Sequence, residues 1–297
     1  MLCLSQQQSC TLARRLTSGM MKTGIWVREW IMFSIRWPRI AAILLVMCLA
    51  LPALADEDWR GKVAIITGSS SGLGYELALM AAEKGMRLVL VDIDPEPSRA
   101  LAARVLAEGG EAVAVEVDLA DPDQRPQVVE AALEAFGTVD VLFNNAGYLY
   151  SATLEQMDLE AARHQFEVNY WTYVDLAQEV IPIMKAAGGG TIVNIASAII
   201  HRPASSGLGH YAATKQAIRG SFEAAAEELA PYDIDIFIAS PGGLATNILR
   251  NAVGPLAEET DRDAADVWEH PSVAARDIFE GMAGDALHLH PGAAEGP

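Results

Sequence analysis

The fold is decided by the stretch Thr67-Gly68-Ser69-Ser70-Ser71-Gly72-Leu73-Gly74. It follows a short β-branched run, 62–67, and precedes a helical pattern, so it forms a strand-to-helix turn. Glycine permits a tight turn and a close approach of phosphate to the backbone, and the free N–H groups of a helix N-terminus stabilise the charge. Three glycines alone would also suit an ordinary turn. The strand, turn and helix order is what favours a dinucleotide-binding unit.

The rest of the chain repeats this alternation of strand and helix. Short β-branched runs alternate with helical patterns, which predicts right-handed βαβ units and a parallel sheet covered on both faces. The fold class is therefore α/β, a Rossmann-type doubly wound parallel sheet of about seven strands in a single domain. The expected strands cover 62–67, 87–92, 112–117, 139–143, 191–196, 234–239 and 286–290. The expected helices cover 73–84, 96–108, 125–136, 159–186, 210–230 and 273–282, and a long loop with one short helix covers 247–271.

Asp92 ends the second expected strand, 18 residues after Gly74. In dinucleotide-binding folds this position receives the adenosine ribose, where a carboxylate accepts hydrogen bonds from both hydroxyls and repels a 2′-phosphate. The turn between Gly68 and Gly74 contains no Arg or Lys to pair with such a phosphate. Asp92 therefore favours NAD over NADP, although an acid that only caps the next loop together with Asp94 would look the same in the sequence.

The spacing Thr-Gly-x-x-x-Gly-x-Gly resembles that of the short-chain dehydrogenase/reductase family. Further family motifs follow in order: Asp118-Leu119, Asn144-Asn145-Ala146-Gly147, Val168-Asn169, Ile192-Val193-Asn194-Ile195-Ala196-Ser197, Tyr211-Ala212-Ala213-Thr214-Lys215 and Pro241-Gly242-Gly243-Leu244-Ala245-Thr246. The resemblance covers about residues 60–290. It implies an NAD(P)-dependent oxidoreductase that transfers hydride to or from an alcohol or ketone. One departure is the end of the chain, 284–290, which lacks the family's Gly-rich ending and puts tail-mediated tetramer packing in doubt.

The family's cofactor contacts carry over residue by residue. The resemblance implies that Asp118 and Leu119 flank the adenine and that Thr246 holds the nicotinamide carboxamide. The full expected cofactor set is Gly68, Ser70, Gly72, Leu73, Gly74, Asp92, Asp118, Leu119, Asn145, Ala146, Gly147, Tyr211, Lys215, Pro241, Gly242 and Thr246. The expected cofactor is NAD, with NADP less favoured, and the resemblance also implies a homodimer or homotetramer.

Tyr211 and Lys215 stand four residues apart on an expected helix, so both side chains lie on one face. A phenol with its ordinary pKa of about 10 is a poor base at neutral pH. A nearby ammonium and a positive nicotinamide ring should lower that pKa, so that Tyr211 exchanges a proton with the substrate oxygen. Ser197 ends an apolar strand at the ligand-binding edge and offers its hydroxyl to the same oxygen. By resemblance, Asn169 is the fourth catalytic residue, whose backbone carbonyl holds a water beside Lys215.

Two other kinds of function have to be weighed against this one. A hydrolase could use nearby serines and histidines, Ser205, Ser206, His201 and His210, but no Gly-x-Ser-x-Gly turn follows a strand. A non-catalytic sensor or scaffold that binds NAD on the same fold is the second alternative, and the intact catalytic set argues against it. The candidate pocket residues are mostly apolar, which favours a hydrophobic alcohol or ketone: Ala198, Ile199, Tyr148, Leu149, Leu244, Ile248 and Leu249.

The charge of the chain argues against nucleic acid as a partner. There are 21 Lys and Arg against 39 Asp and Glu, a net charge of −18, and such a surface repels phosphate backbones. All three cysteines lie within residues 1–55. His288 and His290 alternate along the last expected strand without a metal-ligand spacing, so no metal site is expected.

Residues 1–55 differ from the rest. Arg36 and Arg39 precede the apolar run 40–51, and Pro52-Ala53-Leu54-Ala55 matches an Ala-x-Ala cleavage site. The run is shorter than the roughly 20 residues that a membrane span needs. Translation from Met32 would give a signal of ordinary length.

From these features we expect residues 1–55 to be a signal peptide or membrane-targeting segment, and residues 56–297 to be the NAD(P)-binding domain. Export, or membrane association through 40–55, is the expected localisation. The alternative is a cytoplasmic enzyme with a spurious extension.

Overall fold

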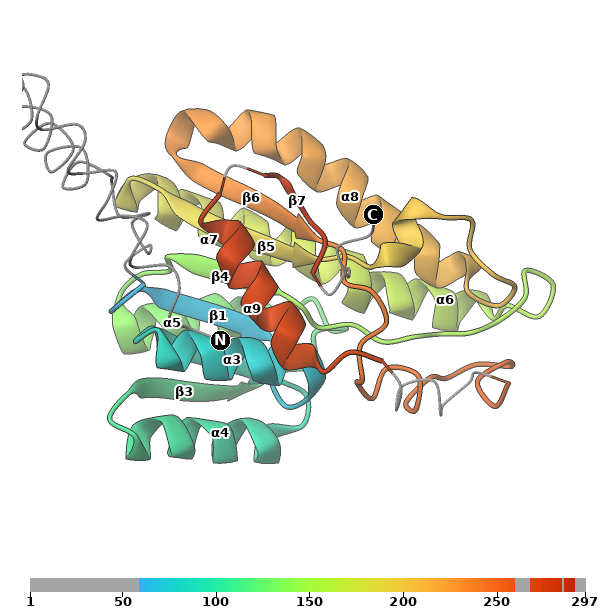
Figure 1. Ribbon diagram of the computed structural model, residues 1–297, viewed down its shortest axis with the longest axis horizontal. Helices are drawn as coiled ribbons and strands as arrows, with labels where there is room; N and C mark the ends of the chain where they lie inside the picture. The colour runs from blue at the N-terminus through green and yellow to red at the C-terminus, as the bar shows by residue number, and fades with distance from the viewer. Residues whose placement is uncertain (1–58, 260–267, 285, 292–297) are drawn as a thin grey trace, which may run out of the picture. The chain divides into compact units, whose positions relative to one another are not determined.

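The computed structural model describes residues 59–259, 268–284 and 286–291 (Figure 1). In these ranges seven strands form one parallel sheet in the order β3-β2-β1-β4-β5-β6-β7. The strands are β1 (Val63–Thr67), β2 (Arg87–Asp92), β3 (Glu111–Glu116), β4 (Val141–Asn144), β5 (Gly190–Ile195), β6 (Ile234–Ala239) and β7 (His288–Leu289). The strand order reverses between β1 and β4, which confirms the predicted doubly wound sheet and creates a crevice at its carboxyl edge.

Helices cover both faces of this sheet (Figure 1). Their bounds are α3 (Gly72–Glu83), α4 (Pro95–Ala107), α5 (Pro126–Phe136), α6 (Leu159–Phe166), α7 (Thr172–Ala187), α8 (Gly209–Leu229) and α9 (Pro271–Met282), with shorter turns η1 (Glu167–Trp171), η2 (Ala198–His201) and η3 (Ala230–Tyr232). Apolar residues of α3, α4 and α9 pack on one face, and those of α5, α7 and α8 pack on the other. The two-sided cover explains why the strands read as continuous apolar runs.

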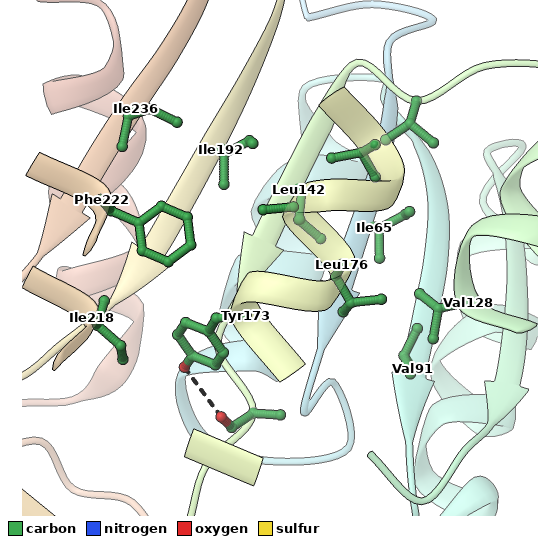
Figure 2. Close-up of a cluster of buried hydrophobic side chains, with 14 of the residues drawn as sticks. Ile65, Val91, Val128, Leu142, Tyr173, Leu176, Ile192, Ile218, Phe222 and Ile236 are labelled. Carbon is green, nitrogen blue, oxygen red and sulfur yellow. Dashed lines mark hydrogen bonds between the residues drawn. The ribbon is translucent and has the colours of Figure 1, made fainter. Parts of the chain in front are cut away.

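Successive strand residues serve the two faces in turn. Ile65 and Leu142 belong to the core under α5, α7 and α8, whereas Ile66 and Phe143 belong to the opposite core. Figure 2 shows the first of these cores, which includes the fully buried Tyr173 of α7. Burial on both sides fixes the register of each strand, because a slip of one residue would exchange the two faces.

The long helix predicted over 159–186 is interrupted by a π-helical turn, η1. The carbonyl of Glu167 accepts from the backbone N–H of Thr172, five residues later, and also from the Thr172 hydroxyl at 3.0 Å. A guanidinium nitrogen of Arg125 is 3.4 Å from the same carbonyl. These side-chain donors compete with the regular helical ladder, which is how a π-turn is sustained inside a helix.

Near the C-terminus one smaller prediction is wrong, and another stays a prediction. The last strand is much shorter than the predicted 286–290, since β7 pairs with β6 only through His288 and Leu289 and Pro291 has no N–H to extend the ladder. The loop after β6 contains turns over 247–259, and neither that stretch nor 268–270 contains the expected short helix. The remainder of the loop, 260–267, lies outside the described residues.

The expectation of export or membrane anchoring is corrected as well. Within the ranges that the structure describes, no helix is both long enough and apolar enough to cross a bilayer. Residues 1–55, including the run 40–55 that carried the expectation, lie outside those ranges. The domain boundary near residue 56 stays a prediction.

Candidate active site

The glycine-rich turn connects β1 to α3 at the carboxyl edge of the sheet. Gly68 has a φ of +69°, which favours glycine. A Cβ on Gly74 would lie 2.0 Å from the Gly68 carbonyl oxygen, a distance that no side chain could tolerate. Asn145, after β4, closes the turn from the other side, since its Nδ2 donates to the Thr67 carbonyl at 2.8 Å. The turn therefore has no room for a side chain at position 74.

Thr67 is a site residue that the motif contains but sequence reasoning assigned no role. Its buried hydroxyl accepts hydrogen bonds from the backbone N–H groups of Asn145 at 2.9 Å and Ala146 at 3.0 Å, and it is 3.2 Å from the Phe143 carbonyl, to which it donates. One side chain thus joins β1 to β4 where the strand order reverses. Its position before the first glycine was the only available signal.

Asp92 lies at the end of β2, where it was expected. One carboxylate oxygen accepts from the Ser70 N–H of the glycine-rich turn at 3.0 Å, and the other accepts from the Asp94 N–H at 3.0 Å. The carboxylate is half-buried and fixed by these two contacts. The loop-capping role that Asp92 could have had with Asp94 is therefore present, together with a direct link to the turn.

Asp118 and Leu119 follow β3 at the same edge. Asp118 Oδ1 accepts from the Ala120 N–H at 2.9 Å, which shapes a tight loop. The Leu119 carbonyl accepts from Arg125 Nε at 2.9 Å and from the Thr172 hydroxyl at 2.8 Å. Hydrogen bonds from the buried side chains of Arg125 and Thr172 therefore hold the loop that is expected to flank an adenine.

An open groove of about 320 Å³ lies between the glycine-rich turn and the loop after β6. Thr246 lines it opposite Gly72, and a Cβ on Gly72 would lie 3.1 Å from the Thr246 methyl carbon. The lining residues are Ser70, Ser71, Gly72, Tyr75, Glu76, Ala245, Thr246, Asn247, His270 and Pro271. Pro241 and Gly242 begin the same loop, and the Pro241 carbonyl accepts from the N–H of Ala198 at 2.8 Å.

Tyr211 and Lys215 both belong to α8 and are brought to this edge from one helix face, as predicted. Lys215 is 3% exposed, and its ammonium donates to the Ile195 carbonyl at the end of β5 at 2.8 Å. Its Nζ is 5.9 Å from the centre of the Tyr211 ring. Gly147 faces Lys215, since a Cβ there would lie 3.6 Å from Lys215 Nζ.

The pKa values of this pair are set mainly by burial. Burial lowers the pKa of Lys215 to about 7 and raises the pKa of Tyr211 to about 12. A hydrogen bond with Ser197 works in the opposite direction on Tyr211. Desolvation is therefore the dominant influence on the phenol when no nicotinamide ring is bound, and the expected lowering by the ammonium together with the ring stays a prediction.

Ser197 follows β5 and precedes η2. Its hydroxyl oxygen is 3.3 Å from the N–H of Ile199, from which it accepts, and it interacts with the Tyr211 hydroxyl. The serine and the tyrosine are thus brought together from segments 14 positions apart in the chain. Between them they can contact one substrate oxygen.

Asn169 lies within η1 and is fully buried. Its Oδ1 accepts from the Tyr148 N–H and its Nδ2 donates to the Tyr148 carbonyl, both at 3.0 Å. The same Nδ2 is 3.3 Å from the hydroxyl of Thr214, the residue before Lys215. The π-turn therefore places Asn169 between the Asn-Asn-Ala-Gly loop and α8.

Only some of the expected pocket residues gather around Tyr211. Leu149, Ile248 and Leu249 form a small apolar cluster with Tyr211, together with Leu208, which the sequence gave no reason to select. The others are held in separate contacts: Ile199 in one core, Leu244 in the other, and Tyr148 against Tyr150 with its hydroxyl 2.8 Å from His164 Nδ1.

The histidines at the last strand make local contacts. His288 Nε2 lies 3.0 Å from a Glu223 carboxylate oxygen, and His290 stacks edge-on against His201. Within the described ranges, no group of three or more His, Cys, Asp or Glu side chains is placed to hold a metal ion.

Comparison with known proteins agrees with this geometry. The family model for the short chain dehydrogenases matches residues 62–255. The chain is 34% identical over 197 residues to the cyclohexanol dehydrogenase of an Acinetobacter species, covering 66% of this chain and 78% of that protein. It is 35% identical over 191 residues to the 2,5-dichloro-2,5-cyclohexadiene-1,4-diol dehydrogenase of Sphingobium indicum, covering 64% and 76%.

The fold is shared with solved members of the same family. A short-chain dehydrogenase/reductase from Burkholderia phymatum in complex with NAD superposes with a TM-score of 0.73 at 27% identity, covering 78% of this chain and 89% of that one. Other similar structures are complexes with NADPH or NADP. The chain belongs to the short-chain dehydrogenase family and is an oxidoreductase of that type.

Proposed function

We propose that this protein is an NAD-preferring dehydrogenase that interconverts an apolar secondary alcohol and its ketone, with Tyr211 as the proton-transferring residue. One observation carries the proposal: the Tyr211 hydroxyl, the Ser197 hydroxyl and the buried Lys215 ammonium meet at the sheet edge that also holds the glycine-rich turn.

The residues at this edge fit a nicotinamide dinucleotide. Gly68 and Gly74 carry no side chain, and their neighbours leave no room for one. No side chain of these two residues therefore covers the start of α3, where backbone N–H groups can face a pyrophosphate. Leu73 would contact the pyrophosphate at the start of α3, and Thr246 would hold the nicotinamide carboxamide. Asn145, Ala146, Gly147, Pro241 and Gly242 would line the rest of the cleft. The dinucleotide supplies or accepts the hydride when it is bound.

The proton steps follow from the chain's own side chains. The phenol of Tyr211, whose pKa is raised to about 12 by burial, is protonated at neutral pH and suited to donate to a carbonyl oxygen. Ser197 would donate a hydrogen bond to the same oxygen and fix its position. Lys215, with a pKa lowered to about 7, exchanges protons readily near neutrality, and the Asn169 carbonyl would hold the water that connects it to solvent.

Asp92 supports a preference for NAD over NADP. Its carboxylate is fixed next to the turn by Ser70 and Asp94, at the position where an adenosine ribose binds in this fold. A fixed negative charge repels a 2′-phosphate and accepts hydrogen bonds from ribose hydroxyls. Asp118 and Leu119 would flank the adenine.

The apolar cluster beside Tyr211 supports the substrate class. Leu149, Leu208, Ile248 and Leu249 belong to the same small apolar cluster as Tyr211, and such surroundings would leave a sugar's hydroxyls without partners. The relatives named for cyclohexanol and for a cyclohexadiene diol agree with a ring-shaped secondary alcohol. We therefore propose alicyclic alcohols and ketones as substrates.

Turnover separates this proposal from a non-catalytic NAD sensor. The purified protein should reduce NAD with cyclohexanol, measured as growth of NADH absorbance, and should prefer it to a polyol of equal size. A protein that binds NADH but leaves its absorbance unchanged with a panel of secondary alcohols and ketones would be a sensor, and the proposal would be wrong.

We also propose that the protein is a homodimer or homotetramer. Trp171, at the end of η1, is 45% exposed and lines an apolar hollow with Met157 and Phe166. A large exposed aromatic beside such a hollow is typical of a surface covered by another protein. The molar mass in solution, measured by light scattering, tests this, and a monomer would contradict it.

A further inference from the structure

Arg125 is a charged side chain with almost no contact with solvent, since only 2% of it is exposed. It stands immediately before α5, and its guanidinium reaches three separate segments. Its Nε donates to the Leu119 carbonyl at 2.9 Å, its Nη2 donates to a Glu167 carboxylate oxygen at 2.8 Å, and its Nη1 pairs with Asp175. Burial of a cation is costly unless its donors are satisfied, and here each nitrogen has an acceptor.

Thr172 makes the same connection independently. Its hydroxyl is 2.8 Å from the Leu119 carbonyl and 3.0 Å from the Glu167 carbonyl, so its single hydrogen is shared between the adenine-side loop and η1. Thr172 is fully buried, like Arg125, and water cannot replace these contacts. Two residues therefore join the loop 118–119 to the π-turn.

The connection continues from η1 to the catalytic residues. Asn169 is two positions after Glu167 in the same turn, and its side chain holds both backbone groups of Tyr148 and contacts Thr214. Thr214 precedes Lys215. Buried hydrogen bonds, joined through the backbone of residues 167–169, thus connect the adenine-side loop to the catalytic helix.

We propose that Arg125, assisted by Thr172, is a positioning residue that couples occupation of the adenosine half of the cofactor site to the placement of Asn169. The inference rests on the proposed function, because it needs a dinucleotide at this edge. A planar guanidinium can serve a carbonyl and two carboxylates at once, which a lysine ammonium cannot do with the same geometry. A shift of the loop on adenosine binding is therefore transmitted to η1.

The coupling can be tested by supplying the two halves of the cofactor as separate molecules. Reduced nicotinamide mononucleotide lacks the adenosine half, and AMP can fill that half separately. With cyclohexanone as substrate, AMP should raise the turnover of the mononucleotide by about tenfold in the wild-type protein, within the usual range of coupling between sites. In Arg125→Met and in Thr172→Val this acceleration should fall to less than about a third of its wild-type value.

Matched variants separate coupling from a merely structural role. Thr172→Ser keeps the hydroxyl and should restore the AMP acceleration that Thr172→Val loses. Arg104→Met removes an exposed arginine that pairs with Glu108, and it should leave the acceleration unchanged. Thr172→Val is close to isosteric, so it provides the test if Arg125→Met does not fold.

The outcomes are distinguishable. Equal AMP acceleration in the wild type, Arg125→Met and Thr172→Val would overturn the coupling, and so would a wild-type protein that turns over NADH but gains nothing from AMP. A wild-type protein without turnover of NADH would instead contradict the proposed function, and this proposal with it.

Discussion

The glycine-rich turn and the pair Tyr211 and Lys215 lie at the same edge of the sheet. Close packing has opposite consequences for protein stability in these two regions. In the turn, the contacts that close the structure also shape the binding surface, because the small size of Gly74 permits both. In the pair, the burial that prepares the residues for proton transfer disfavours their charged forms, and for the Lys215 ammonium this costs stability: burial lowers the pKa of Lys215 to about 7 and raises the pKa of Tyr211 to about 12. Fold and function agree in the first region and conflict in the second.

This difference predicts that substitutions in the turn lower both stability and cofactor binding. Substitutions in the pair should lower turnover without lowering stability. Residues that serve chemistry at a cost in stability are common at active sites. Variants of the turn and of the pair test this difference.

The largest effect is expected from Gly74→Ala. The added Cβ would lie 2.0 Å from the Gly68 carbonyl oxygen, so the turn must open. We expect a lower melting temperature and a loss of NADH affinity of about 100-fold or more, equivalent to about 3 kcal/mol. Gly220→Ala is the control, because Gly220 lies in α8 with nothing within 4 Å of its Cβ position. Unchanged NADH affinity in Gly74→Ala would contradict the claim that packing in the turn also shapes the binding surface.

Lys215→Met should lower turnover by about 100-fold, the scale of one acid-base contribution, while raising stability at neutral pH. The pKa of Lys215 falls from 10.5 in the unfolded chain to about 7 in the fold, so the unfolded chain binds the extra proton between these values. The resulting destabilisation is absent above pH 10.5, grows as the pH falls and is complete below about pH 7.

The measurement is the difference in melting temperature between Lys215→Met and the wild type across that range. The variant should be the more stable protein at pH 7, and its advantage should disappear near pH 10.5. Lys185→Met, which replaces an exposed lysine, should show no such pH dependence. A constant difference between Lys215→Met and the wild type at all pH values would show that burial of the ammonium does not destabilise the fold.

The smallest effect is expected at Asp92, where the turn meets the ribose. Asp92→Ser removes the charge that would repel a 2′-phosphate, and the ratio of kcat/KM for NAD over NADP should fall by about tenfold, within the 1 to 3 kcal/mol of a partly buried contact. Asp94→Asn removes a neighbouring exposed charge and should leave the ratio almost unchanged. If both variants keep the wild-type ratio, another residue sets the cofactor preference.

The sequence predicted the turn well because its cause is local. Glycines, a preceding strand and an acid after the next strand are all visible within about 30 residues, and the sheet order follows from the repeated βαβ pattern. Asp92, Tyr211, Lys215 and Ser197 were also placed at the correct edge, since each lies at a strand end or on one helix face.

The parts that the sequence did not predict depend on partners far away in the chain. The π-turn around Asn169 is sustained by Thr172 and by Arg125, which is 42 positions before Glu167, so the pattern over 159–186 indicated only one long helix. The pKa of Tyr211 likewise depends on how deeply several segments bury it. Neither quantity can be obtained from spacing along one helix.

The central claim is that Tyr211 transfers the proton, and Tyr211→Phe tests it most directly. The ring keeps its place in the apolar cluster that includes Leu149, Ile248 and Leu249, while the hydroxyl is lost. Turnover of cyclohexanone with NADH, followed by absorbance, should fall by roughly 100-fold or more, and the dissociation constant of NADH should stay within about twofold of the wild type. A variant that folds, binds NADH and keeps more than about a tenth of the wild-type rate would contradict the mechanism.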